Sequence, residues 1–418
     1  MFSKSIEKII YIFLIFSISL FLINSNYSGN FYWQYPSLFD DHPVLFDDHN
    51  SFIDWLECNA IGVDLFTSEK LICNNREVAA FNYGNAILIL PWNQSLDIYY
   101  RNYQPYILIF IFVLLTVKII NPQKNIAKIL LFLCILNTST LMAFDRANVD
   151  LFIYISVILI CFNRIYFINW FLTLFVTFIK IYPAALFVNI FFENSKRSLR
   201  SIMIIIFFIL LLTVVYFFYF KDDVLFFLNN LSGGKAGYHF LFSLNSLPKI
   251  LKYVFNFNYQ ILLIIFYSLF VYSVIKFYKK YAYNIKETDD DIFSLNSKLF
   301  MIGGFVTVIS FSVFSNWLHR EIYLILMIPY VLHNKIGSTY NFNYLFIRIL
   351  VIRYIFLFIY GYINVHDDIT YVESVRVFSN KFLIIIFIKS IFDFFIMGIF
   401  SSILFQKSKL YFKRLINS

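Results

Sequence analysis

Charged side chains from separate parts of the chain have the types needed for a group-transfer reaction. Acidic residues crowd a long polar segment after the first apolar run, and a carboxylate there could take a proton from an attacking hydroxyl. They are Asp40, Asp41, Asp47, Asp48, Asp54, Glu57, Asp64, Glu69 and Glu77. Basic residues follow in later polar segments: Arg146, Lys180, His319 and Arg320. Arginine offers two parallel donors and lysine a point charge, so these residues suit an anionic leaving group such as a phosphate. The alternative is that these are ordinary solvated loop charges with no shared site.

The segments that must position these residues are strongly apolar. Hydrophobic residues make up 60% of the 418-residue chain and charged residues 14%. Runs close to 20 residues match a hydrocarbon core of about 30 Å at about 1.5 Å per residue. The apolar runs lie at about 9–24, 105–120, 127–143, 149–162, 165–180, 184–192, 202–220, 260–278, 299–315, 321–333, 344–364 and 382–405. They predict an all-α polytopic membrane protein, with about 11–12 transmembrane segments in one transmembrane domain over 1–418.

The basic residues indicate an orientation in the lipid bilayer. Lysines and arginines gather in short loops on one side, which the positive-inside rule assigns to the cytoplasm. The same distribution accounts for the net charge of +9, so no nucleic-acid partner is expected. We expect a multi-pass protein of the inner (plasma) membrane, with both termini cytoplasmic if the number of segments is even.

Two loops on the opposite side are long. The first periplasmic loop, 25–104, is rich in acids and includes an apolar stretch at 81–92 that predicts interfacial helices. The second covers 221–259. The charge pattern also requires 165–192 to cross twice, with a break at Pro183. Backbone freed at such a break must be buried in protein or face water, which makes it a candidate site; a plain helical kink is the alternative.

The four cysteines divide into two kinds. Cys134 and Cys161 lie in apolar runs and are expected in the core. Cys58 and Cys73 flank a polar segment on the non-cytoplasmic side, where a disulfide could persist, although the sequence leaves that bond open. The spacing matches no zinc motif, and we expect neither a metal nor a cofactor.

Charged residues also occur inside predicted spans. Lys389 and Asp393 lie four residues apart, so they share a helix face and can neutralise each other. They could form a structural ion pair or part of an ion pathway. Arg348 and Arg353 are expected to extend toward the cytoplasmic interface as anchors.

Motifs spread over most of the chain resemble a family of GT-C-type glycosyltransferases, the glycosyltransferase family 87-like membrane proteins, formerly a domain of unknown function. The matching pieces are Asp48-His49-Asn50-Ser51-Phe52, Glu57 to Asp64, Cys73, Phe81-Asn82-Tyr83, Arg146-Ala147-Asn148-Val149-Asp150, Lys180-Ile181-Tyr182-Pro183, and Asn316 to Arg320 followed by the helix ending at Pro329. Their order and spacing carry the resemblance, because each piece alone is weak.

The resemblance implies a GT-C-like bundle with a large first periplasmic loop. It also implies hexosyl transfer, of hexose or mannose type, from a polyprenyl-phosphate-linked donor to a hydroxyl of a glycolipid or glycan acceptor, with inversion. Asp48 best matches the family's catalytic aspartate, 14 residues before Gly62, with Asp54 and Asp47 in reserve. Arg146, Lys180, His319 and Arg320 would bind the donor phosphate. This assignment is made from their charge and from their predicted side of the membrane. The residues expected to line the substrate pocket are Asn82, Tyr83, Asn148, Asp150 and Tyr182.

The chain also departs from the family pattern. The family often has glycine where Ala147 stands and proline where Gly84 follows Asn82-Tyr83. The first loop carries extra acids as well. These differences leave the specificity open, and they allow a divergent or inactive member.

Two other functions fit the same features. A polymerase or ligase of lipid-linked polysaccharide would also place an acceptor and a lipid phosphate at the outer face, but a dominant arginine-rich second loop would favour it, and here the acidic first loop dominates. A transporter or flippase would find its best support in Lys389 and Asp393. Solute uptake that depends on this pair, without sugar transfer, would distinguish it.

Overall fold

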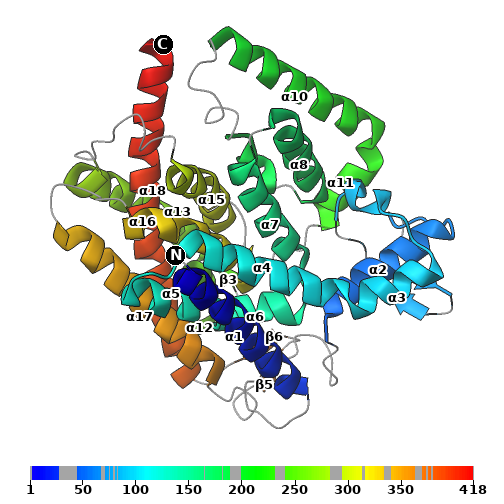
Figure 1. Ribbon diagram of the computed structural model, residues 1–418, viewed down its shortest axis with the longest axis horizontal. Coiled ribbons are helices and arrows are strands. Elements are labelled where there is room, and N and C mark those ends of the chain that lie inside the picture. Colours follow the sequence, from blue (N-terminus) through cyan, green and yellow to red (C-terminus); the bar gives the residue numbers. More distant parts are fainter. Residues whose placement is uncertain are drawn as a thin grey trace.

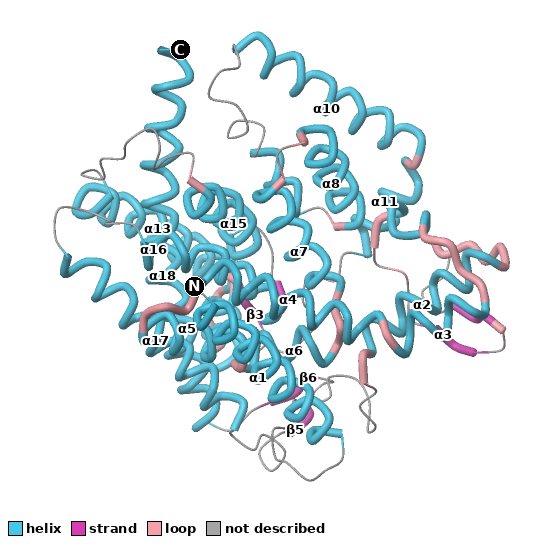
Figure 2. Tube along the Cα trace, in the orientation of Figure 1, coloured by secondary structure: helices cyan, strands magenta, loops and turns pink. Residues whose placement is uncertain are grey.

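The computed structural model is that of an all-α protein with a few short strand pairs (Figures 1 and 2). It describes residues 2–27, 45–66, 71–74, 76–78, 81, 83–163, 165–180, 182–188, 199–230, 241–282, 294–312, 316–333, 340–362, 370–372, 375–377 and 380–417. The expected all-α class is confirmed, since helices account for most of this part of the chain.

The first part of the chain contains two long helices and several short ones. The helices are α1 (Phe2–Tyr27), α2 (Asp47–Ala60), α3 (Gln94–Asn102), α4 (Gln104–Ile120), α5 (Asn125–Ile135), α6 (Thr138–Asp145), α7 (Val149–Phe162), α8 (Tyr166–Ile179), α10 (Leu199–Tyr219) and α11 (Lys221–Asn230). Two 3₁₀ segments are interspersed, η1 (Asn85–Ile89) and η2 (Tyr182–Val188).

The second part ends in the longest helix of the described residues. Its helices are α12 (Ser246–Phe255), α13 (Tyr259–Phe277), α15 (Leu295–Ser312), α16 (Ile328–His333), α17 (Tyr340–Tyr362) and α18 (Asn380–Asn417). The π-helical turn η4 (Tyr278–Ala282) continues α13, and the 3₁₀ segment η5 (Leu318–Met327) leads into α16. The antiparallel strand pairs are β1 (Leu71–Cys73) with β2 (Arg76–Val78), β3 (Leu241–Phe242) with β4 (Asn316–Trp317), and β5 (Thr370–Val372) with β6 (Val375–Val377).

Four of the described helices are long and apolar enough to cross a membrane. These spans are Ser5–Asn24, Tyr259–Lys280, Leu295–Ser312 and Phe387–Lys413. The number rises to six if the bent pairs α3–α4 and α5–α6, with angles of 43° and 48°, each form one span. The chain is thus an all-α protein with four to six candidate membrane spans.

This number is below the 11–12 segments predicted from the apolar runs, because several runs are divided into shorter helices. The run at 127–143 is interrupted at Asn137, whose side chain accepts a hydrogen bond from the Thr140 amide and caps α6. Helices α7 and α8 have 14 residues each, or about 21 Å, which is less than the roughly 30 Å of a hydrocarbon core. The break expected near Pro183 is present and begins at Lys180, which has extended backbone angles after α8.

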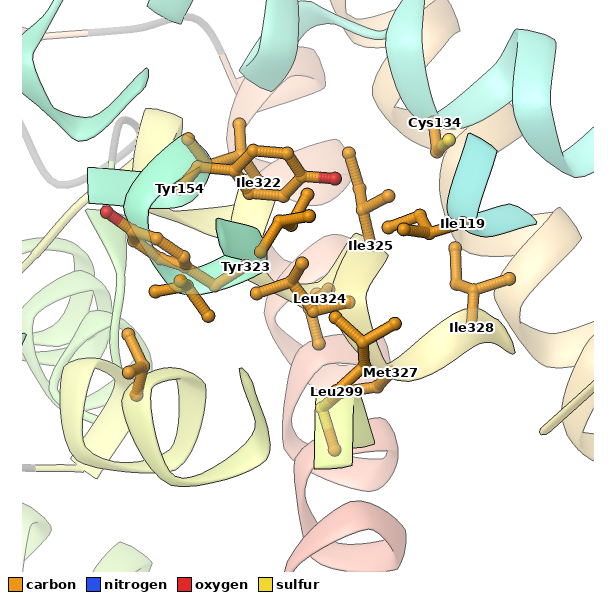
Figure 3. Close-up of a cluster of buried hydrophobic side chains, with 14 of the residues drawn as sticks. Ile119, Cys134, Tyr154, Leu299, Ile322, Tyr323, Leu324, Ile325, Met327 and Ile328 are labelled. Carbon is orange, nitrogen blue, oxygen red and sulfur yellow. The ribbon is translucent and has the colours of Figure 1, made fainter. Parts of the chain in front are cut away.

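The segment η5 runs through the centre of the apolar core (Figure 3). Its residues from Ile322 to Met327 are at most 1% exposed. Figure 3 shows Ile322, Tyr323, Leu324, Ile325 and Met327 grouped with Tyr154, Ile119 and Leu299 of other helices. A 3₁₀ run of 10 residues is unusually long, so its path depends on tight packing from neighbouring helices.

The outermost helices display apolar side chains instead of burying them. Phe207 and Phe218 of α10 are 63% and 74% exposed, and Ile264 of α13 is 69% exposed. Figure 1 shows α10 lying along the edge of the molecule. Such surfaces are unfavourable in water and suit contact with lipid chains.

Gly303 of α15 permits the close approach of η5. A Cβ at this position would lie 2.5 Å from the Cβ of Leu326, whereas a Cβ at Gly398 of α18 would have its nearest neighbour at 3.6 Å. We predict that Gly303→Ala lowers the melting temperature of the purified protein, with a loss of roughly 1–3 kcal/mol from overpacking. The matched change Gly398→Ala should be neutral or stabilising by roughly 0.5–1 kcal/mol. Equal melting temperatures of the two variants would contradict this account of η5.

Candidate functional site

The start of α2 is joined to the turn between α6 and α7 by backbone hydrogen bonds. The amide of Phe46 donates to the carbonyl of Asp145 at 2.8 Å, and the amide of His49 donates to the carbonyl of Arg146 at 3.2 Å. These bonds place the first turn of α2, which carries Asp48, beside the motif 146–150. Two segments that lie about 100 residues apart in the sequence therefore form one structural unit.

The turn at 146–150 has a backbone conformation that presents several polar side chains. Ala147 has a positive φ of 43°, the left-handed region in which glycine is favoured. A glycine would adopt this conformation without the strain that the Ala147 Cβ incurs. Asn148 then caps α7, and its side-chain oxygen accepts a hydrogen bond from the amide of Asp150 at 2.9 Å.

Six side chains meet at this turn and form what we term the acid–base cluster. Its members are Asp48, Arg146, Asn148, Asp150, Lys180 and Arg320. Arg146 pairs with Asp48 at 2.7 Å, and Asn148 donates to the other oxygen of that carboxylate at 2.5 Å. Three cations and two carboxylates leave the cluster with one excess positive charge.

The second half of the acid–base cluster surrounds Asp150, whose side chain is fully buried. Lys180 Nζ lies 3.1 Å from one carboxylate oxygen, and Arg320 Nε lies 3.7 Å from the other. Lys180 also donates to Asn148 at 3.4 Å, so the Asn148 amide links the two ion pairs. The hydroxyl of Tyr323, which the sequence did not single out, donates to the backbone carbonyl of Asp150 at 3.2 Å.

The environment of Lys180 changes its acidity. The pKa of the Lys180 ammonium is lowered to about 8, chiefly by burial; the Asp150 carboxylate opposes this shift and the Arg320 charge adds to it. The ammonium also lies 5.0 Å from the centre of the Tyr83 ring. Burial, together with the charges of Asp48 and Asp150, holds the pKa of the Tyr83 hydroxyl well above its usual value.

Gly84 brings the first loop against the end of α8. Its amide donates to the carbonyl of Ile179 at 3.0 Å, and a Cβ at this position would lie 1.8 Å from the carbonyl oxygen of Phe178. A proline at 84 would lack the N–H that makes this bond. Gly84 therefore allows Tyr83 to reach Lys180.

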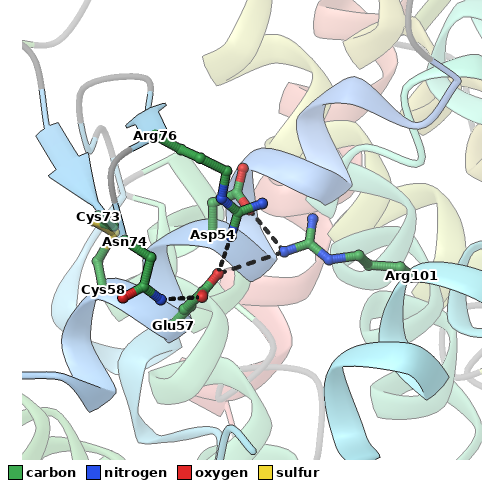
Figure 4. Close-up of a disulfide and its surroundings, with 7 residues drawn as sticks. All are labelled: Asp54, Glu57, Cys58, Cys73, Asn74, Arg76 and Arg101. Atoms are coloured by element: carbon green, nitrogen blue, oxygen red, sulfur yellow. Dashed lines mark hydrogen bonds and ion pairs between the residues drawn. A yellow bond between two sulfur atoms is a disulfide. The ribbon is translucent and has the colours of Figure 1, made fainter. Parts of the chain in front are cut away.

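Asp54 belongs to a different group of charges, close to a disulfide (Figure 4). Arg101 of α3 pairs with Asp54 at 2.7 Å and also lies 4.0 Å from Glu57. Glu57 accepts hydrogen bonds from Asn74 at 2.6 Å and Arg76 at 2.7 Å. Asp54 was expected as an alternative base beside Arg146, but its described partner is Arg101 of this second group.

Cys58 and Cys73 are joined by a disulfide, with their Cα atoms 5.5 Å apart. This is the pairing that the sequence left open. The bond connects the end of α2 to β1, so the Asn74 and Arg76 contacts with Glu57 form directly beside it (Figure 4). Disulfide and ion pairs together hold α2, β1, β2 and α3 as one packed unit.

Three residues expected in the site cannot be placed in it. Asn82 lies outside the described residues, as do the side chains of Tyr182 and His319. The other expected members Asp48, Arg146, Lys180 and Arg320 meet, together with Tyr83, Asn148 and Asp150.

The strained turn at Ala147 supplies a test of the local structure. We predict that Ala147→Gly raises the free energy of unfolding by roughly 1 kcal/mol, because glycine adopts a φ of 43° without the penalty that a Cβ incurs. Ala143→Gly, within α6, is the matched control and should destabilise by at least about 0.5–1 kcal/mol. Thermal denaturation of the two purified variants measures the difference, and a loss of stability in both would argue against the left-handed turn.

No family model, curated protein or solved structure matches this chain. The geometry of the acid–base cluster and the sequence motifs that form it are therefore the features of this chain that bear on its function.

Proposed function

We propose that the chain is a membrane glycosyltransferase of GT-C type that uses a polyprenyl-phosphate-linked sugar donor. The observation that carries the proposal is that Asp48, Arg146, Lys180 and Arg320, chosen from sequence for a base and a phosphate site, belong to one cluster. The resemblance of the surrounding motifs to the family 87-like enzymes supports the same reaction. Candidate membrane spans supply the setting that a lipid-linked donor requires.

In the proposed reaction, the hydroxyl oxygen of the acceptor attacks the anomeric carbon of the sugar. The bond between that carbon and the phosphate oxygen breaks, and the electron pair leaves with the polyprenyl phosphate. Asp48 takes the hydroxyl proton as the new bond forms. Phosphate is a good leaving group, so no general acid is needed, and attack from the opposite face inverts the anomeric centre.

The cations have separate roles in this reaction. Arg146 and Asn148 hold the two oxygens of Asp48 and so orient its carboxylate. Lys180 and Arg320 already neutralise Asp150, and the excess positive charge of the acid–base cluster attracts the donor phosphate. Side chains of Asp48, Arg146, Lys180 and Arg320 retain between 11% and 20% exposure, so small ligand groups can reach them.

The site is proposed to face the periplasm, because the charge pattern predicts that the acidic first loop and the later basic turns lie on the side opposite the Lys- and Arg-rich loops. The acceptor would be a hydroxyl of a glycolipid or glycan.

The base assignment is tested by comparing two aspartates of the same loop. We predict that Asp48→Asn lowers sugar transfer in membranes by about 10²–10⁴-fold, because an amide cannot accept the hydroxyl proton. Asp54→Asn is the matched control: it removes the same charge from the Arg101 group and should leave most of the transfer activity. Transfer is measured with a radiolabelled polyprenyl-phosphate-linked sugar. Full activity of Asp48→Asn would remove the assignment.

The proposed role of Lys180 in binding the donor phosphate is tested by measuring the KM for the donor at different pH values. Because its pKa is lowered to about 8, the ammonium is charged below that pH and becomes neutral as the pH rises through it. We predict that the KM for the donor rises between about pH 7 and pH 9. In Lys180→Arg the guanidinium stays charged, so the rise should disappear even if the basal KM differs. An unchanged pH profile in Lys180→Arg would show that another group causes the rise.

A further inference from the structure

Four charged side chains, each at most 3% exposed, form a second network in the interior: Glu321, Arg353, Lys389 and Asp393. They come from three elements, η5, α17 and α18. Glu321 contacts Arg353 at 2.5 Å and Lys389 at 2.9 Å. Asp393 contacts the same two cations, each at 2.7 Å. Two carboxylates and two cations make this buried network neutral.

The network confirms one sequence-based prediction and contradicts another. Lys389 and Asp393 do form the expected ion pair, four residues apart on α18. Arg353 was expected to extend toward the cytoplasmic interface, and that expectation is wrong for this residue, because its side chain is fully buried between Glu321 and Asp393. A buried arginine requires such partners, and Glu321, distant in sequence, supplies one of them.

Glu321 is the residue that follows Arg320 of the acid–base cluster. A 3₁₀ helix has three residues per turn, so neighbouring side chains point about 120° apart and residues three apart share a face. Arg320 and Tyr323 accordingly both reach Asp150, the first with its guanidinium and the second with its hydroxyl. Glu321 points away from that face, toward α17 and α18.

Most of the described side chains of η5 beyond Glu321 pack without polar contacts. Apart from the Tyr323 hydroxyl, the buried side chains from Ile322 to Met327 are apolar (Figure 3). Apolar packing is non-directional, whereas a buried carboxylate is strongly destabilised when it moves away from its counter-ions. Glu321 makes two ion pairs, with Arg353 and Lys389, on helices that carry no member of the acid–base cluster.

We propose that Glu321 is a positioning residue: the buried charge network holds η5 in the rotation at which Arg320 reaches Asp150. The proposed positioning role concerns where the Arg320 side chain lies, and it does not depend on whether the site transfers a sugar. Its effect on catalysis rests on the proposed function.

The placement can be measured with a thiol reporter at position 320. The native cysteines are protected, since Cys58 and Cys73 form a disulfide and Cys134 and Cys161 are buried. Arg320→Cys therefore introduces an accessible thiol at a side chain that is 18% exposed. The rate of its reaction with a maleimide, in the full-length protein in membranes, reports on the position of η5.

Two variants, each of which removes one carboxylate charge from the buried network, distinguish a positioning role of Glu321 from a general loss of stability. Glu321→Gln and Asp393→Asn each leave two cations and one carboxylate in the buried network, but only the first breaks the link to η5. In the Arg320→Cys background, Glu321→Gln should change the labelling rate by about tenfold and Asp393→Asn by less than about twofold. Equal effects of the two variants, or no effect of Glu321→Gln, would overturn the proposal.

A third variant covers the case in which Glu321→Gln does not accumulate in membranes. Glu321→Asp keeps the network neutral but shortens the side chain by one methylene, so it should change the labelling rate in the same direction. A labelling rate in Arg320→Cys/Glu321→Asp equal to that of Arg320→Cys alone would then overturn the anchoring role.

The catalytic consequence is tested with a double-mutant cycle on sugar transfer. Arg320→Gln and Glu321→Gln should each lower kcat/KM by about tenfold, and the double variant should be no worse than Arg320→Gln alone, because Glu321 acts through Arg320. Additive losses would contradict this route. If the unmodified protein transfers no sugar, the proposed function fails, while the labelling experiment still decides the role of Glu321.

Discussion

The buried carboxylate of Asp150 is the constraint on which the arrangement of the site depends. An ionised group without solvent contact is strongly destabilising unless cations and hydrogen-bond donors reach it. Lys180 arrives from the end of α8 and Arg320 from the start of η5, so one carboxylate joins elements that are far apart in the sequence. Asn148 then connects this buried pair to the more exposed pair of Asp48 and Arg146.

The segment η5 lies between two groups of charges with different properties. Toward α7 it contributes Arg320 to a partly exposed cluster with an excess positive charge. Toward α17 and α18 it contributes Glu321 to a neutral network that is closed to solvent. A neutral buried network favours one geometry over others, and an exposed cluster with excess charge favours binding an anion. The two arrangements are compatible because adjacent side chains of a 3₁₀ segment point in different directions.

The acids of the first loop serve two purposes that their sequence positions do not distinguish. Asp48 and Asp54 are six residues apart in α2, and each has an arginine partner at 2.7 Å. Asp48 faces the turn that carries Arg146, whereas Asp54 faces α3 and the charges beside the disulfide. The second group strengthens the unit that carries α2, and so it supports Asp48 at a distance from the proposed chemistry.

By itself, the sequence determined the membrane class, because runs of apolar residues can only be buried in protein or lipid whatever their neighbours are. It also identified most of the residues that meet at Asp150, from their charge and from local motifs. The tertiary structure decided which apolar runs form long helices, since apolar character alone does not reveal a break such as that at Asn137, where the neighbouring Thr138 hydroxyl donates to the distant carbonyl of Leu357. It also decided the partners of Asp54, Glu321 and Arg353, because a contact between distant residues depends on how the helices pack and not on the spacing within either one.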